Sequence, residues 1–175
     1  RFKEKRPPAL ASQALEALKT IVKTPLRNAL QQAQHLGLAR LDAQMLLLHS
    51  LGRDPNDRAW LLAHDDDALL TDTLAAYLAL CQRRAAGEPV AYLTGCKSFY
   101  GLPLAVDARV LDPRPDTETL VDWALELLAP CAAPRIADLG TGSGAIALAL
   151  QSQRPDARVL AVDASADALD VAQAN

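Results

Sequence analysis

Three glycines at alternate positions form the feature of this sequence with the clearest chemical meaning. They lie in the segment Asp138-Leu139-Gly140-Thr141-Gly142-Ser143-Gly144, between a short apolar stretch and a strongly helix-forming one. Glycines in such a place let the backbone turn tightly and approach a ligand without a β-carbon in the way. Dinucleotide-binding loops of α/β proteins have the spacing GxGxxG, whereas this loop has GxGxG. No Gly-Lys-Ser/Thr follows, which excludes a Walker A nucleotide loop.

A carboxylate, Asp163, stands at the end of the next apolar stretch. In nucleoside-binding α/β folds, a carboxylate at this position accepts hydrogen bonds from ribose hydroxyls. S-adenosylmethionine contains a ribose but no pyrophosphate, so it suits both the acid and the tighter glycine spacing. The pattern therefore predicts a site for this cofactor, and its predicted residues are Gly140, Thr141, Gly142, Ser143, Gly144 and Asp163. The alternative is a glycine-rich turn in an unrelated α/β protein.

The elements around the glycine loop predict how it is positioned. Residues 135–139 suggest a short buried strand, the segment from Ala145 to Gln151 a helix, and residues 158–163 the next strand. Ser165 is a typical cap for a further helix. This β-α-β-α order predicts a parallel, doubly wound sheet of the α/β class. Because a sheet of two strands is not stable alone, we expect the chain to stop inside this second domain.

The first half of the chain has a different pattern of apolar residues. Residues 10 to about 87 show apolar side chains at helical spacing and predict five short helices in a small bundle, with no strand before residue 85. The helical pattern ends at Gly87-Glu88-Pro89, and residues 92–106 suggest a β-hairpin linker. The expected domains are an unassigned segment 1–24, a helical bundle 25–87, a hairpin linker 88–112, and the first part of a cofactor-binding domain 113–175.

Composition narrows the class of function. The 175 residues have a net charge of −3, without the basic excess that a broad nucleic-acid footprint usually needs. Three cysteines without a CxxC pair predict neither a zinc site nor disulfides, so a reducing cytoplasm is the natural setting. The three histidines are scattered and indicate no metal site. No apolar run is long enough to predict a membrane span.

Four ordered motifs make the chain resemble a known family. It is similar to the protein-glutamine methyltransferases that modify peptide-chain release factors, the HemK/PrmC family, from about Leu26 to Asn175. The matching segments are Asp42–Leu47, similar to the family's DAExLL; Gly87–Gly95 and Phe99–Leu102, similar to GEPxAYLxG and FxGL; Pro113–Glu118, which is PRPDTE; and the glycine loop with Asp163. Asp112 stands where the family usually has an apolar residue.

The resemblance implies a function for the whole protein. It implies an N-terminal helical bundle that docks the substrate and a Rossmann-like class I methyltransferase domain that uses S-adenosylmethionine to methylate a glutamine amide of a release factor. In the family, an Asn-Pro-Pro-Tyr motif holds that amide, and no such motif occurs in this chain. We therefore assign no catalytic residue and expect these 175 residues alone to be inactive. Asp138 is expected to order the loop, Trp123 to lie in the core, and Arg114, Thr117 and Glu118 are candidates for approaching the site.

Two other functions stay open from the sequence. Adenine amino-methyltransferases share the Asn-Pro-Pro-Tyr type of motif, although the mild acidity of this chain and its release-factor-type linker argue against DNA as substrate. A non-catalytic fragment whose helical bundle binds a partner is the second alternative.

Overall fold

The structure, a computed structural model, describes residues 24–175. This part of the chain forms two compact units, and the division between them lies between Ala86 and Gly87. We call them the helical unit and the α/β unit. The helix expected over residues 10–22 lies outside the described residues.

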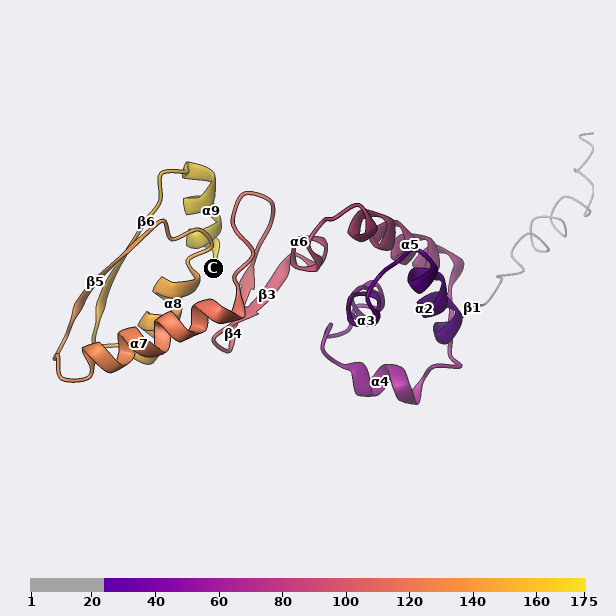
Figure 1. Ribbon diagram of the computed structural model, residues 1–175, viewed down its shortest axis with the longest axis horizontal. Coiled ribbons are helices and arrows are strands. Elements are labelled where there is room, and N and C mark those ends of the chain that lie inside the picture. Colours follow the sequence, from indigo (N-terminus) through magenta and orange to yellow (C-terminus); the bar gives the residue numbers. More distant parts are fainter. Residues whose placement is uncertain (1–23) are drawn as a thin grey trace, which may run out of the picture. The chain divides into compact units, whose positions relative to one another are not determined.

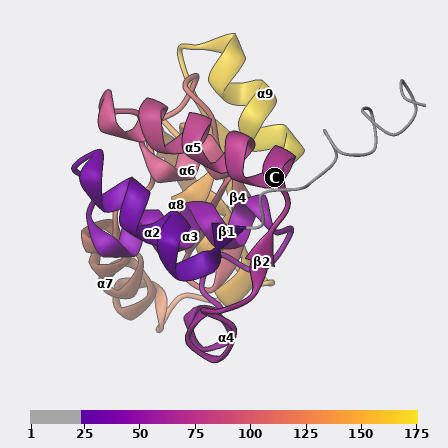
Figure 2. The same cartoon turned by 90° about the vertical axis from the view of Figure 1, so that its right-hand side faces the viewer.

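The helical unit is built from four helices around a leucine-rich centre. The helices are α2 (Leu26–His35), α3 (Arg40–Ser50), α4 (Arg58–Ala63) and α5 (Thr71–Ala85). Helix α3 carries the buried side chains Leu46, Leu47 and Leu48. It contacts the other three helices (Figures 1 and 2). Glycines with a left-handed backbone follow α2 and α3, at Gly37 with φ +85° and Gly52 with φ +67°, which is the usual way for a helix to end.

The expectation of helices alone before residue 85 is wrong. Strand β1 (Thr24–Pro25) pairs antiparallel with β2 (Ala68–Leu69). The reason lies at the start of α2, where the N–H groups of Leu26 and Arg27 donate to the carbonyl oxygens of Asp67 and Asp65 at 2.9 and 3.0 Å. These backbone acceptors satisfy two of the free N–H donors at the start of α2, and they bring the two short strands together.

One buried hydroxyl links two helices of this unit and allows a test of its packing. The Tyr77 side chain on α5 is fully buried, and its hydroxyl donates to the Ala43 carbonyl of α3 at 3.2 Å. Burial raises the pKa of Tyr77 far above its ordinary value of 10.0, so the hydroxyl stays protonated and remains a donor. We expect Tyr77→Phe to lower the free energy of unfolding by about 1 kcal/mol in urea titrations. An unchanged midpoint and slope would show that this hydrogen bond contributes nothing.

The α/β unit begins with a short helix and a tight hairpin. Helix α6 (Val90–Thr94) ends at Gly95, whose backbone is left-handed, and strands β3 (Cys96–Phe99) and β4 (Leu102–Ala105) follow. Tyr100 and Gly101 form the turn with φ values of 50° and 78°, the two positive values of a type I′ hairpin. The hairpin expected near residues 92–106 is confirmed. Its first strand begins only at Cys96, because the segment after Pro89 takes a helical turn first.

The parallel strand pair expected at the glycine loop is confirmed. Strand β5 (Arg135–Leu139) pairs with β6 (Arg158–Val162), and helix α8 (Ala145–Gln153) makes the crossover between them. The fold class is therefore α/β. The remaining elements of this unit are a 3-10 turn η1 (Pro115–Thr117), helix α7 (Glu118–Leu128) and helix α9 (Ala166–Ala174).

Strand β5 is not the buried strand that its apolar sequence suggested. Ile136 packs against the core. In contrast, 78% of Leu139 and 62% of Leu160 on β6 are exposed to solvent. Successive side chains of a strand point to opposite faces. Helix α8 contacts both strands, and within the described residues no second layer covers Leu139 and Leu160.

The core of the α/β unit joins the hairpin to the helices. Phe99 and Leu104 of the hairpin lie in one apolar cluster with Val121 of α7 and Val171 of α9, all four nearly inaccessible to solvent. Trp123 was expected in the core, and that expectation is wrong, because 59% of it is exposed. It follows Val121 by two residues, a rotation of about 200° around the helix, so it lies on the opposite face of α7.

Candidate functional site

The glycine loop connects β5 to α8 and takes its shape from the end of β6. The N–H groups of Gly140 and Thr141 both donate to the carbonyl oxygen of Val162, at 2.7 and 3.0 Å. Gly140 and Gly142 have φ values of +79° and +55°, in the left-handed region that favours glycine. The chain can therefore double back over the end of β6 at this point.

Asp138 orders the loop, as expected from the sequence. Its carboxylate oxygen Oδ2 accepts a hydrogen bond from the Thr141 hydroxyl at 2.7 Å. Thr141 and Ser143 are buried, with exposed fractions of 7% and 3%, although both side chains are polar. The loop is thus a packed part of the fold rather than a loose surface turn.

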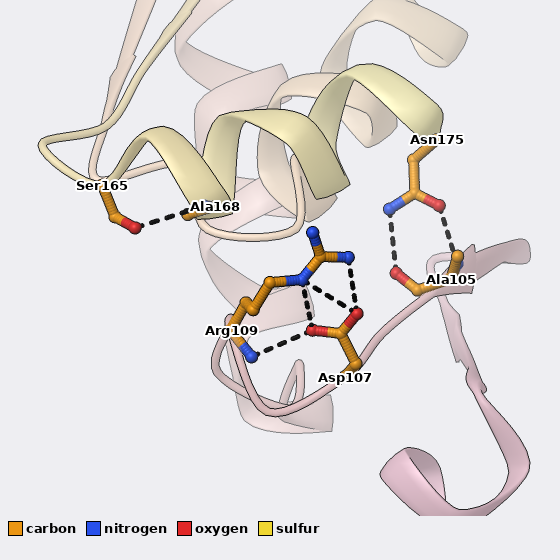
Figure 3. Close-up of polar contacts among 6 residues, drawn as sticks. All are labelled: Ala105, Asp107, Arg109, Ser165, Ala168 and Asn175. Atoms are coloured by element: carbon orange, nitrogen blue, oxygen red, sulfur yellow. Dashed lines mark hydrogen bonds and ion pairs between the residues drawn. The ribbon is translucent and has the colours of Figure 1, made fainter.

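Asp163, the predicted site residue outside the glycine loop, lies directly beside the loop. Its Oδ2 accepts from the N–H of Gly142 at 2.9 Å, and its Oδ1 accepts from the N–H of Ser165 at 3.0 Å. Ser165 in turn caps α9 through the N–H of Ala168 at 3.2 Å (Figure 3). The two parts of the predicted site, separate in sequence, therefore meet through the Asp163 carboxylate.

The three glycines have different surroundings. A β-carbon added at Gly140 or Gly142 would meet no atom within 4 Å, whereas one at Gly144 would lie 3.3 Å from both the Ala172 β-carbon and a Leu148 methyl. Gly144 is thus needed for close packing of α9 against the start of α8. Gly140 and Gly142 instead leave open space beside the backbone, where a ligand can approach.

The donor set of the loop fits a cofactor with a ribose and without a pyrophosphate. The N–H groups of Gly140, Thr141 and Gly142 are already bonded within the protein, so they do not form the outward-facing cradle that a phosphate needs. An ionised carboxylate has about four acceptor positions. Two on Asp163 are used by backbone N–H groups, which leaves acceptors for the hydroxyl groups of a ribose.

The ionisation of Asp163 leads to a prediction about pH. Hydrogen bonds from the Ser165 and Gly142 N–H groups hold the pKa of this carboxyl below its ordinary value of 3.8. A lowered pKa means that the interactions of the carboxylate persist above the ordinary value and are lost only as pH falls through the lowered one. We expect cofactor affinity, measured by calorimetry, to be flat from pH 8 to about 5. A decline between pH 7 and 6 would mean that another group, not Asp163, controls binding.

The three residues considered for approaching the site have other partners. A Glu118 carboxylate oxygen accepts from the Tyr100 N–H at 2.8 Å, which ties α7 to the hairpin turn. The Arg114 guanidinium lies 3.7 Å from the Asp112 carboxylate, and the Thr117 N–H donates to the Arg114 carbonyl. Among the described residues, their hydrogen bonds and ion pairs support the hairpin and the start of α7 rather than the glycine loop.

Asp112, the departure from the family pattern, lies in a partly enclosed ion pair. Its Oδ1 is 3.3 Å from the Lys97 ammonium on β3, and only 13% of its side chain is exposed. The charge that replaces an apolar residue here is therefore compensated by a cation from the hairpin.

Asn175 is a polar residue beside the loop that the sequence did not reveal. Its side-chain amide donates to the Ser143 carbonyl at 2.9 Å. No motif pointed to it, because a single asparagine near the end of a helix has many ordinary roles.

Within residues 24–175, no group of three or more histidine, cysteine, aspartate or glutamate side chains is arranged to hold a metal ion. In the same range no helix is long and apolar enough to cross a membrane.

Comparison with known proteins matches both units. The family model of the PrmC N-terminal domain matches residues 24–95, and that of the methyltransferase small domain matches residues 117–175. A release factor glutamine methyltransferase of Bordetella pertussis is 54% identical over 139 residues, 79% of this chain and 50% of the relative. Proteins of the same name from Burkholderia pseudomallei and Escherichia coli K12 are 51% and 48% identical, over 79% and 86% of this chain and 47% and 53% of their own lengths.

The chain spans about half the length of the curated relatives it matches. The two matched domains follow one another in the order expected from the motifs, and the identity to the relatives is about one residue in two. The chain belongs to the HemK/PrmC family.

Proposed function

We propose that the full-length protein, a polypeptide of the relatives' length that contains this chain, is a release factor glutamine methyltransferase. It would transfer a methyl group from S-adenosylmethionine to the side-chain amide of a glutamine in a peptide-chain release factor. The proposal implies a cytoplasmic protein, because release factors act where translation ends. No direct contact with nucleic acid or membrane is part of it.

One observation carries the cofactor part of this proposal. The Asp163 carboxylate and the Gly142 backbone are joined by a hydrogen bond of 2.9 Å, beside glycines with open space at their α-carbons. This arrangement supports binding of a nucleoside through its ribose, with the rest of the cofactor lying along residues 140–144. The matched methyltransferase domain supports S-adenosylmethionine as that nucleoside.

The chemistry follows from the two reacting groups. S-adenosylmethionine, when bound, supplies a methyl group on a positively charged sulfur. An amide nitrogen is a poor nucleophile because its lone pair is delocalised, so the enzyme has to orient it and favour localisation of that pair. In this proposal Asp163 and the glycine loop hold and orient the ribose, and none of the residues of this chain is assigned to the amide.

We also propose separate functions for three segments of the chain. Residues 25–87 would dock the protein substrate, residues 88–112 would connect the two domains, and residues 113–175 would bind the cofactor. The match of residues 24–95 to the PrmC N-terminal domain supports a separate role for the first of these segments.

A transfer assay tests the proposed activity. The full-length protein is incubated with methyl-labelled S-adenosylmethionine and either an unmodified release factor or adenine-containing DNA. Label in the release factor, located by mass spectrometry on a glutamine amide, is the expected result. Label in adenine instead would establish the amino-methyltransferase alternative, and label in neither substrate would refute the proposal. The 175-residue chain serves as a second sample, and we expect it to transfer nothing.

A further inference from the structure

The end of α9 makes a three-way contact that neither the family motifs nor the cofactor proposal uses. The Asn175 side chain accepts from the N–H of Ala105 at 2.6 Å and donates to the carbonyl of the same residue at 3.0 Å. Figure 3 shows this paired contact with the end of strand β4. The same amide nitrogen donates its second hydrogen to the Ser143 carbonyl at 2.9 Å.

These contacts use the full donor capacity of the amide. An asparagine side chain has two N–H donors and one carbonyl oxygen. At Asn175 one donor bonds to the hairpin, the other to the glycine loop, and the oxygen accepts from the hairpin. An aspartate of the same shape would lack both donors and would direct a negative charge at two carbonyl oxygens.

A second contact between α9 and the loop supports a common purpose. Ala172, one turn before Asn175, packs closely on Gly144. A β-carbon added at Gly144 would lie only 3.3 Å from the β-carbon of Ala172. Val171 of the same turn lies in the core cluster with Leu104 of β4. Helix α9 therefore holds the loop at Ser143 and Gly144, and it holds the hairpin through Asn175 and Val171.

We propose that Asn175 is a positioning residue, which fixes the glycine loop against strand β4 and so keeps the loop in its cofactor-binding shape. This inference rests on the proposed function, because it assigns the loop to S-adenosylmethionine. In this proposal the hairpin supports the cofactor site, because Asn175 links the end of β4 to the glycine loop. Asn175 would act through Ser143 and would not touch the cofactor itself.

The test uses three variants of the full-length protein: Asn175→Ala, Asn175→Asp and, as a matched control, Gln173→Ala. Gln173 is an exposed amide on the same helix. Hydrogen exchange of the loop amides is measured without cofactor, and affinity for S-adenosylmethionine is measured by calorimetry. In Asn175→Ala we expect exchange at residues 142–144 to rise and affinity to fall by about fivefold each. The control should match the parent.

The aspartate variant provides a readout that a merely structural residue would not give. At pH 7 its carboxylate should weaken affinity more than alanine does. Protonation restores one O–H donor. The affinity of Asn175→Asp relative to the parent should therefore recover as pH falls toward about 4.5, whereas that of Asn175→Ala should not. This comparison remains informative if the alanine variant folds poorly.

The outcomes separate this inference from the proposed function. Faster exchange confined to the loop, with the pH-dependent recovery, supports positioning by Asn175. Unchanged loop exchange and affinity, or exchange that rises equally throughout the α/β unit, overturns it. If the parent protein does not bind S-adenosylmethionine, the proposed function fails, and loop exchange still decides whether Asn175 fixes the loop.

Discussion

Replacing Gly142 with valine should weaken S-adenosylmethionine binding on the order of 100-fold or more. Gly142 has a φ of +55°, a conformation in which a β-branched residue is strained by about 1–3 kcal/mol. Its N–H also bonds to Asp163, so a backbone that relaxes this strain pulls away from the carboxylate. A branched side chain would in addition fill the open space beside the loop.

The matched control for this variant is Gly52→Val in the helical unit. Gly52 also has a positive φ, +67°, and open space around its α-carbon, so it experiences comparable backbone strain far from the loop in sequence. Calorimetric titration should show near-parental affinity for Gly52→Val, provided circular dichroism shows that both variants are folded. Equal affinities for Gly142→Val and the parent would mean that the ligand does not approach the loop at this point.

Replacing Asp163 with alanine should lower the affinity for S-adenosylmethionine at least about tenfold. The variant loses the acceptors proposed for the ribose hydroxyls. It also loses the two acceptors that hold the N–H groups of Gly142 and Ser165. Asp163→Asn keeps one acceptor oxygen and can therefore retain one of those two backbone contacts, so it should weaken binding less than alanine does.

Asp170→Ala is the matched control for the charge. Asp170 is an exposed carboxylate on α9, so its removal changes the net charge equally without touching the loop. We expect this control to bind the cofactor like the parent. If Asp163→Ala also binds like the parent, the ribose assignment is wrong, whatever the cofactor.

The parts of the fold that could be predicted are those in which local sequence and tertiary structure agree. The crossover between β5 and β6 follows from apolar stretches of strand length on either side of a helix former, and the glycine loop follows from spacing alone. The contact of Asp138 with Thr141 could also be expected, since the two side chains are three residues apart in a tight loop.

The misses have a different origin, in contacts between segments far apart in the chain. The pairing of Thr24 with Leu69 depends on where the loop after α4 returns, and no local pattern contains that information. Trp123 was expected in the core, whereas the side of α7 that faces the core is the one that carries Val121, which is completely buried. Asn175 contacts Ala105 across 70 residues of sequence.

The site shows the same division. Residue type and order identified the loop and Asp163. They did not show that the Asp163 carboxylate already accepts two backbone N–H groups, because backbone orientation in a loop depends on glycine conformation. Asp163 therefore supports the loop through these two contacts. The proposed recognition of a ribose would be a second function of the same carboxylate.

Separate titrations with two cofactors show most clearly which ligand the glycine loop binds. Calorimetric titrations of the full-length protein with S-adenosylmethionine and with NADH, at the same pH and salt, compare a nucleoside cofactor that has no pyrophosphate with a dinucleotide that contains one. We expect saturable binding of S-adenosylmethionine at one site, which Gly142→Val should weaken strongly, and no binding of NADH. Binding of NADH without binding of S-adenosylmethionine would contradict the assignment of the glycine loop.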